Sequence, residues 1–551
     1  MNTLNRRSLL LAGLGTAGAG LLAACSGETR STAPALVSPS GPAVAAAEKK
    51  RRHSGGREHR VRLTATHGTV DLGGGKTVRT WSFDGRLPGK EIRLTAGDTL
   101  VADLANHLPT STSVHWHGLA LRNDMDGVPP ITQRAVAPGG SFGYRFIADT
   151  PGTYWFHPHV GVQLDRGLYG PLIVEDPHEP LRYDDEWVVV LDDWLDGVTG
   201  TPDQAFAALR QGMDHGSMSH GGGSSSHGGE GGGHGGMDGM PGMDGMSGMG
   251  GMDMGSSGGG MDMGGSGGGM DMGPFMLMGA SSTLLGGDAG DVKYPHYLVN
   301  GKVPAAPATY RGKPGRRLRL RIINAGGDTA FRVALGGHRL TVTHTDGYPV
   351  VHEPADALLI GPGERYDALV TLDDGVFPLV ALAEGKGAAG LGVVRTGSGD
   401  TPSPTVRPKE LDGRIPNAAA LRPADGVRLA ARKPDVTHRI ELTGGMAKYG
   451  WGLNGRRFDM NRPDARPFTV DAGQRVRLQF HNATEMWHPM HLHGHTFRLG
   501  AAGPRKDTVI VLPGTTVSCD FDADNPGRWM LHCHNAYHGE SGMMGLVAYR
   551  A

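Results

Sequence analysis

Three stretches of the chain share one pattern of hydrophobic and polar positions. In each, leucines and β-branched residues alternate with arginines or other polar residues, and a turn of the Asn-Gly or Asp-Gly type comes before the stretch. Alternation with a period of two is typical of a β-strand with one buried face, and such turns join paired strands. The stretches are 91–106, 317–324 and 468–482, and their turns are Asp84-Gly85, Asn300-Gly301 and Asn454-Gly455.

Short strands separated by Gly- and Pro-containing turns predict an all-β protein made of β-sandwiches. Because the pattern occurs three times, we expect three copies of one domain, and 551 residues are enough for three or four domains. We assign them to residues 58–180, 181–400 and 430–551, with a Pro-rich linker at 401–429.

The N-terminal region has a different composition, which predicts export. Two arginines, Arg6 and Arg7, precede an apolar run of small residues that ends near Ala24, as in a twin-arginine (Tat) signal. The run is short and glycine-rich for a membrane span. Residues 22–25 resemble a bacterial lipobox, in which Cys25 would be lipidated; an ordinary signal peptide with a chance cysteine is the alternative. We therefore expect residues 1–57 to be a signal and a disordered tether, and the mature protein to be a membrane-anchored lipoprotein outside the cytoplasm.

Charge and cysteine content narrow the function classes. The formal net charge is -1 and aromatic residues are sparse, so nothing indicates a nucleic-acid-binding surface. Three cysteines are too few for a disulfide framework. Of these, Cys519 lies in a predicted strand, 516–521, and is expected to be a small buried hydrophobic residue.

The remaining cysteine, Cys533, has a histidine on each side. In an extended strand His532 and His534 would share one face and Cys533 would take the other. A histidine follows Cys533 by five residues and a methionine by ten. A thiolate with two imidazoles and a weak axial thioether is the blue-copper arrangement. The second imidazole is available upstream, among the histidines of residues 488–493.

Further histidines occur in pairs two residues apart, a spacing that puts two imidazoles on one face of a strand. Together with the histidines that flank Cys533 they make eight, enough for a cluster of three metal ions. Structural zinc sites are closed by four ligands with thiolates prominent, so ten histidines around one thiolate favour copper. The eight, called the cluster histidines below, are His115, His117, His157, His159, His491, His493, His532 and His534.

The four motifs HWHG, HPH, HPMHLH and HCH-x3-H-x4-M resemble the complete signature of the multicopper oxidases, the laccase and cuprous-oxidase family, over about residues 61–551. The resemblance implies cupredoxin-like Greek-key domains and four copper ions. The first and third copies carry every motif histidine, so the cluster is expected between them. Histidines of the middle copy, such as His338, His344 and His352, are expected to be structural.

The resemblance also implies the ligand sets and the reaction. Substrate would be oxidised one electron at a time at a type 1 copper, and electrons would pass through Cys533 to a cluster that reduces O2 by four electrons to water. The implied ligands are His488, Cys533, His538 and axial Met543 for type 1 copper, His115 and His491 for type 2, and His117, His157, His159, His493, His532 and His534 for the type 3 pair.

Reduction of O2 also needs protons, which acids near the cluster should supply. Many bacterial family members have glutamate directly after the second type 1 histidine, whereas this chain has Gly539 there and Glu540 one residue later. Asp126, after the first motif, is the other candidate acid.

Between residues 211 and 273 the composition changes abruptly. Thirteen of the 24 methionines fall here, in a Gly/Ser background that predicts a disordered insertion. A linker of no consequence is the alternative, but thioethers select Cu(I), and similar insertions occur in the copper-resistance branch of the family. We call this segment the Met-rich insertion.

Three functions fit these features. A Cu(I) oxidase in copper tolerance would use the Met-rich insertion and a Cu(I) site at Glu485 and Met486, unless Met486 belongs to the core. A laccase-type oxidase would act on phenols, aromatic amines or Fe(II). A copper-sequestering lipoprotein is the third, but the intact ligand set argues against it. The expected partners are O2 and Cu(I) or another small reducing substrate, and we expect a monomer.

Overall fold

The computed structural model describes residues 35–51, 56–211 and 273–551. The predicted signal with Cys25 and nearly all of the Met-rich insertion lie outside these residues. From residue 36 onwards, the described residues form one compact unit. In the described part of the chain, no helix has the length and apolar character needed to cross a membrane.

The first domain is a pair of four-stranded sheets, as the alternating pattern predicted. One sheet is ordered β2 (Lys76–Phe83), β1 (Glu58–Gly73), β4 (Asp98–His107) and β6 (Ser141–Ala148), and the other β3 (Ile92–Thr95), β8 (Gly170–Glu175), β7 (Gly152–His157) and β5 (His115–His117). Strand β1 pairs parallel with β4 and antiparallel with β2.

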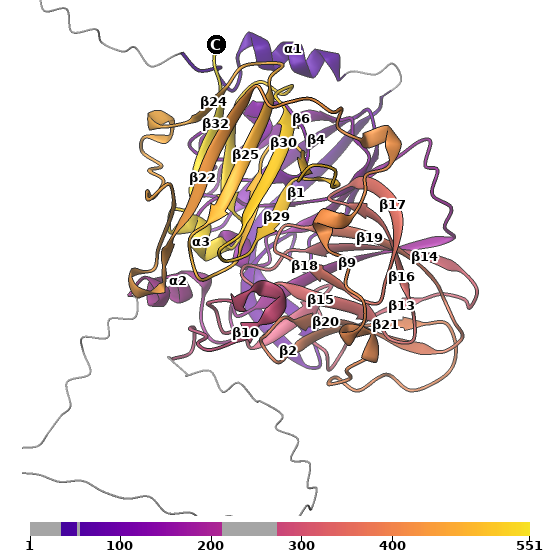
Figure 1. Ribbon diagram of the computed structural model, residues 1–551. Coiled ribbons are helices and arrows are strands. Elements are labelled where there is room, and N and C mark those ends of the chain that lie inside the picture. Colours follow the sequence, from indigo (N-terminus) through magenta and orange to yellow (C-terminus); the bar gives the residue numbers. More distant parts are fainter. Residues whose placement is uncertain (1–34, 52–55, 212–272) are drawn as a thin grey trace, which may run out of the picture. The chain divides into compact units, whose positions relative to one another are not determined.

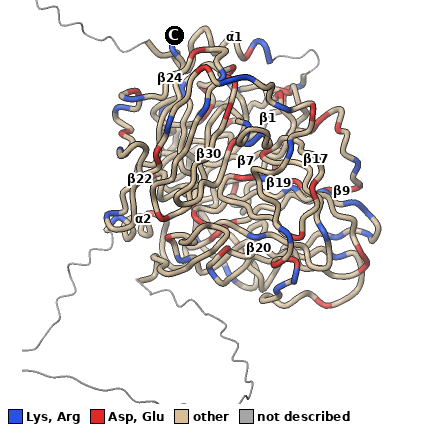
Figure 2. The backbone as a smooth tube through the Cα atoms, in the orientation of Figure 1, with Lys and Arg blue, Asp and Glu red and all other residues tan. Residues whose placement is uncertain are grey.

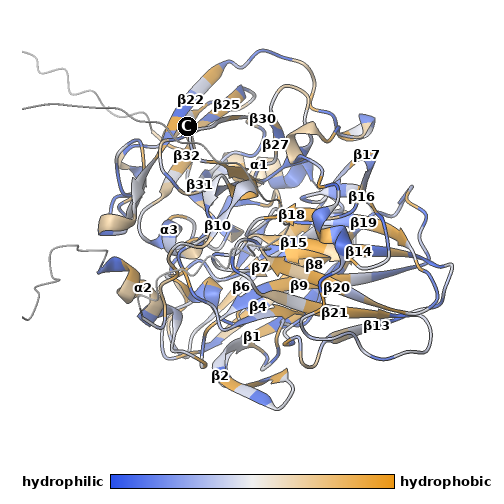
Figure 3. Ribbon diagram, turned by 60° about the horizontal axis from the view of Figure 1, so that its bottom comes forward, coloured by the Kyte–Doolittle hydropathy of each residue, from blue (hydrophilic) through white to orange (hydrophobic). Residues whose placement is uncertain are grey.

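The middle domain has a six-stranded and a five-stranded sheet. The first is ordered β12 (His296–Val299), β9 (Asp185–Trp194), β14 (Arg317–Asn324), β19 (Arg365–Thr371), β16 (Leu340–Thr345) and β17 (Tyr348–Ala355). The second is ordered β13 (Ala308–Arg311), β21 (Ala389–Arg395), β20 (Val376–Ala383), β15 (Phe331–Leu335) and β18 (Leu358–Ile360). Apolar colour in Figure 3 is concentrated on the strands around β15, β18 and β20.

The third domain repeats this arrangement and is orange to yellow in Figure 1. Its six-stranded sheet is ordered β23 (Gly450–Leu453), β22 (Val436–Gly445), β25 (Arg475–Asn482), β30 (Thr516–Asp522), β27 (Phe497–Leu499) and β28 (Arg505–Lys506). Its five-stranded sheet is ordered β24 (Phe468–Val470), β32 (Met544–Tyr549), β31 (Arg528–Cys533), β26 (His488–Leu492) and β29 (Thr508–Val511). Lys and Arg are interspersed with Asp and Glu over most of the described chain (Figure 2).

The three predicted turns have the expected conformation. Asp84, Asn300 and Asn454 have φ of 54°, 50° and 53°, and the glycine after each has φ between 69° and 71°. Two successive left-handed residues define the type I′ turn, which Asn-Gly and Asp-Gly favour. Cys519 also lies where expected, fully buried in β30.

The N-terminal segment, residues 36–51, differs from the expected disordered tether. It contains α1 (Pro42–Lys50), in which Val44 is 1% exposed. The N–H of Val37 donates to the carbonyl of Tyr549, and a carboxylate oxygen of Glu48 accepts from the N–H of Ile147. The Ala- and Pro-rich composition concealed this packing because the partners come from the first and third domains.

Candidate copper centres

Three potential ligand atoms converge inside the third domain. His488 opens β26, Cys533 ends β31, and His538 lies in the short helix α3 (Ala536–Glu540). Because β26 and β31 are adjacent antiparallel strands, their ends meet. The Cys533 Sγ lies 3.7 Å from the Nδ1 of His488 and 3.8 Å from that of His538, and the two Nδ1 atoms are 3.0 Å apart. Met543 is fully buried, and its carbonyl accepts from the N–H of Cys533.

Polar partners hold the outer nitrogens of both imidazoles. His488 Nε2 lies 2.8 Å from the Thr484 hydroxyl, and His538 Nε2 lies 2.8 Å from the Asp291 carboxylate, which also accepts from Tyr449. Such contacts orient the inner nitrogens towards a metal. Burial lowers the pKa of His538, but the Asp291 carboxylate together with Cys533 outweighs it and raises the pKa to about 10.

The cluster histidines come in two quartets, one from the first domain and one from the third. His115 and His157 are opposite each other on β5 and β7, and His491 and His532 are opposite each other on β26 and β31. The second histidine of each sequence pair, two residues further along the chain, lies on the same side. His115 stacks on a third-domain histidine, His493, with ring centres 3.7 Å apart. The two quartets therefore form one group of rings across the domain interface.

Within this group the rings form two triangles. His117, His157 and His534 have centroid separations of 4.9–5.7 Å, and His159, His493 and His532 of 5.0–5.1 Å. The remaining pair, His115 and His491, is 6.0 Å apart. The triangles correspond to the six predicted type 3 ligands and the pair to the predicted type 2 ligands. The assignment to copper types stays a prediction.

The group fits copper ions. Buried ring nitrogens of six cluster histidines have no hydrogen-bond partner, which is costly unless a ligand occupies the space. Burial and neighbouring histidines hold the pKa of most of these imidazoles well below its usual range, so they are neutral and able to coordinate. The affected residues are His157, His159, His493, His532 and His534, with His117 lowered in the same way by burial and His491.

Both candidate acids lie near the group, in different positions. Asp126 is fully buried, with its carboxylate 3.0 Å from His493 Nδ1 and 3.2 Å from His115 Nδ1. Glu540, at the end of α3, lines a cavity of about 40 Å³ whose wall also contains His157 and His534. Burial raises the pKa of Glu540.

The structure separates the two residues of the predicted Cu(I) site. Met486 is 3% exposed and packs in the core, whereas the neighbouring Glu485 is exposed. Successive residues in an extended segment point to opposite sides, which accounts for the divergence. Met486 therefore has the core position that was the alternative.

Two acids beside the histidines were not found from the sequence. Asp291 contacts His538, and Asp507 contacts His117 and His491 at 3.1 Å and 3.4 Å. Neither acid belongs to a histidine motif, and the pairing of β26 with β29, which brings Asp507 close, is a tertiary feature.

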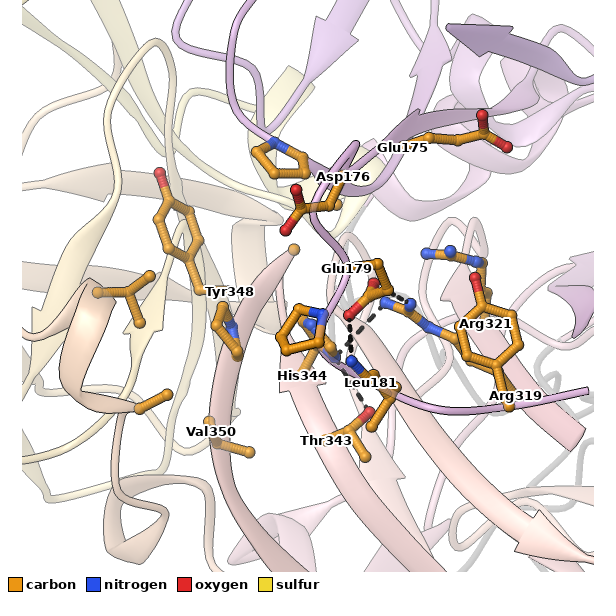
Figure 4. A pocket seen from close by; sticks show the side chains of 18 of the residues that line it. Glu175, Asp176, Glu179, Leu181, Arg319, Arg321, Thr343, His344, Tyr348 and Val350 are labelled. Atoms are coloured by element: carbon orange, nitrogen blue, oxygen red, sulfur yellow. Dashed lines mark hydrogen bonds and ion pairs between the residues drawn. The ribbon is translucent and has the colours of Figure 1, made fainter. Parts of the chain in front are cut away.

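A cavity of about 660 Å³ lies elsewhere, where the first domain, the middle domain and residues 424–427 meet (Figure 4). Two of the arginines in its wall are paired with acids, Arg319 with Asp367 and Glu179, and Arg321 with Asp367. None of the predicted copper ligands lines it. We assign it no catalytic role.

The fold and the histidine arrangement define a copper oxidase, and sequence comparison agrees. Multicopper oxidase family models match residues 64–179, 279–398 and 431–551. The chain belongs to the multicopper oxidase family.

Individual relatives give more detail. Multicopper oxidase MmcO of Mycobacterium tuberculosis is 44% identical, over 99% of this chain and 96% of its own. A copper resistance protein A homolog of Pseudomonas syringae pv. tomato is 28% identical, over 86% and 89%. The crystal structure of a laccase from Botrytis aclada superposes with a TM-score of 0.66 at 24% identity, over 89% and 88%, which shows a shared fold.

Proposed function

We propose that this protein is a Cu(I) oxidase that acts in copper tolerance, with O2 as electron acceptor. The observation that carries the proposal is that the described segments at both ends of the Met-rich insertion contact residues next to the predicted type 1 ligand His538. Copper at the predicted sites would accept electrons from substrate singly and reduce O2 by four electrons to water.

The chain enters the insertion from α2 (Pro202–Arg210), where the ring of Phe206 is 6.3 Å from that of Tyr537 in α3. It returns at residue 273, and the N–H of Leu277 donates to the carbonyl of Asp291. Asp291 in turn holds His538. Both points at which the insertion joins the described chain are thus near the imidazole through which electrons would enter, and the soft thioethers in its sequence favour Cu(I).

The residues of this chain then have distinct roles. Asp291 orients His538, and the peptide chain joins Cys533 directly to two cluster histidines, which is the shortest covalent route between the two sites. We propose Asp126 and Glu540 as proton donors, because one contacts two cluster histidines and the other lines the cavity beside them.

Two of the relatives bear on the choice between Cu(I) and a phenol as substrate. One relative is described as a copper resistance protein homolog, which favours copper tolerance. Laccase-type oxidation of phenols, aromatic amines or Fe(II) is the second candidate, but the similarity to the solved laccase extends to the fold only. A copper-sequestering lipoprotein would not need the cluster histidines.

We also propose export by the Tat pathway, lipidation at Cys25 and a monomeric, membrane-anchored protein. Fractionation tests the anchor, because Cys25→Ala should release the protein from the membrane and wild-type protein found wholly soluble would contradict it.

Steady-state kinetics with Cu(I) and with a phenol test the substrate. Replacing residues 212–272 by a short Gly-Ser linker should raise KM for Cu(I) and leave kcat unchanged, since a tethered ligand contributes binding common to ground and transition states. A length-matched variant with all thirteen methionines of the insertion changed to serine should behave alike. Phenol oxidation and copper content should stay the same. Unchanged Cu(I) kinetics in both variants would favour the laccase reading.

A further inference from the structure

The middle domain contributes no cluster histidine, yet one of its arginines reaches the cluster. Arg365, in β19, is fully buried and bonds to all three domains. Its Nε donates to the carbonyl of Thr153 at 3.1 Å, and its Nη1 to that of Gly363 at 3.0 Å. Its two terminal nitrogens, Nη1 and Nη2, donate to the two carboxylate oxygens of Asp507 at 2.7 Å and 2.6 Å.

Asp507 contacts one cluster histidine from each domain. Its Oδ1 lies 3.1 Å from His117 Nε2 and 3.4 Å from His491 Nδ1, and its carbonyl lies 2.9 Å from the same Nδ1. The opposite nitrogens, His117 Nδ1 and His491 Nε2, are the buried ones without a partner. Asp507 therefore selects a different ring nitrogen in each histidine for the metal, because an N–H bonded to an acceptor leaves the other nitrogen free to coordinate.

A buried carboxylate keeps such a position only if its own oxygens are held. Bidentate pairing with a planar guanidinium fixes the plane of the carboxylate, which a lysine cannot do. Space for the guanidinium exists because Gly118 follows His117: a Cβ there would lie 2.3 Å from Arg365 Nη2. The fourth residue of the first histidine motif thus accommodates Arg365.

We propose that Arg365 is a positioning residue for two copper ligands, His491 of the predicted type 2 site and His117 of the predicted type 3 pair. It acts through Asp507, whose carboxylate holds Nε2 of His117 and lies, beside the main-chain carbonyl of the same residue, against Nδ1 of His491. The inference is independent of whether Cu(I) or a phenol is the substrate, and it gives the middle domain a role beyond spacing the other two.

A purely structural role for Arg365 is the competing explanation, and the chain offers a matched control. Arg319, in the neighbouring strand β14, is 1% exposed. Its Nε and Nη2 donate to Oδ2 of Asp367 at 2.9 Å and 2.6 Å. It lies in the wall of the large cavity (Figure 4) and has no contact with a cluster histidine among the described residues. Arg319→Met removes a buried guanidinium without affecting Asp507.

The experiment compares copper-loaded wild type, Arg365→Met, Arg365→Lys and Arg319→Met. We expect Arg365→Met to keep the blue type 1 absorption but to change the type 2 electron paramagnetic resonance signal and release that copper to a chelator about tenfold faster or more. Arg365→Lys should be intermediate, and Arg319→Met should match wild type in both readouts even if it melts earlier.

A second variant shows whether the effect passes through Asp507. Asp507→Asn should reproduce the altered type 2 signal, and combining it with Arg365→Lys should add little, since residues that act in series are not additive. An unchanged type 2 signal and release rate in Arg365→Lys and Arg365→Met would overturn the proposal. Equal loss of blue and type 2 copper in both would also overturn it, because that is the result of general destabilisation. Should Arg365→Met fail to fold, Arg365→Lys and Asp507→Asn still decide the question.

Discussion

The predicted type 1 ligands and the cluster histidines are assembled differently. His488, Cys533, His538 and Met543 all belong to the third domain, and neighbouring strand ends bring them together. The cluster histidines come from two domains, with rings stacked across the interface. The ligands of one site therefore come from a single sandwich, with Asp291 of the middle domain contacting one of them. The other site depends also on how two sandwiches dock and on the arginine that the middle domain supplies.

Hydrogen bonds between the first and third domains show how the cluster histidines depend on domain docking. The Asn123 side chain donates to the carbonyl of Arg528 at 2.8 Å and accepts from its N–H at 2.9 Å. Asn525 donates to the carbonyl of Leu121. These bonds hold β31, and so His532, against the first domain. Perturbations of the interface should therefore affect the cluster before the type 1 site.

The largest expected effect is local to the third domain. Cys533→Ser removes the thiolate, so the intense blue absorption should vanish while the cluster histidines still bind copper. Absorption spectra and copper counting check this. Cys519→Ser is the matched control, because that thiol is equally buried and far less suited to a ligand role, with burial raising its pKa. Retention of the blue band by Cys533→Ser would disprove the type 1 assignment.

Asn123→Ala should have the opposite effect and weaken the cluster more than the type 1 site. It leaves two backbone groups of Arg528 without their partners, at about 1–3 kcal/mol each where water cannot reach. The cluster should lose copper to a chelator sooner than the type 1 site does, as followed by copper counting and blue absorption.

Asn106→Ala is the control for this variant. The Asn106 side chain bonds only within the first domain in the described structure, to Thr110, Val136 and Leu108. Its loss should lower stability without favouring release from either site. Parallel release of both kinds of copper from Asn123→Ala would show that the two sites do not differ in this way.

A smaller effect is expected from the N-terminal segment, which spans the same two domains. Val44→Ala removes buried methyl groups worth about 1–2 kcal/mol. We expect a lower melting temperature and slightly faster loss of cluster copper, with the blue absorption unchanged. Val198→Ala, at a side chain that is 42% exposed, should change neither. If both variants melt like wild type, the segment contributes nothing to the interface.

Local patterns in the sequence predicted the strands, the turns and the faces on which paired histidines lie, while the cupredoxin-like fold and the ligand sets came from the family resemblance. The period of two predicted strands whose side chains alternate, and the same rule separated Cys533 from His532 and His534. Type I′ turns followed from Asp84-Gly85 and its counterparts. These features depend on backbone sterics over a few residues, so they can be predicted without knowing the rest of the chain.

Tertiary structure alone decided what surrounds the histidines. Asp291, Asp507 and Arg365 come from outside the motifs, and nothing in their sequence neighbourhood indicates a role. The packing of Val44 was equally hidden within an Ala- and Pro-rich segment. A buried carboxylate or guanidinium is placed by partners far away in the chain, because only opposite charges and hydrogen bonds from other domains make its burial possible.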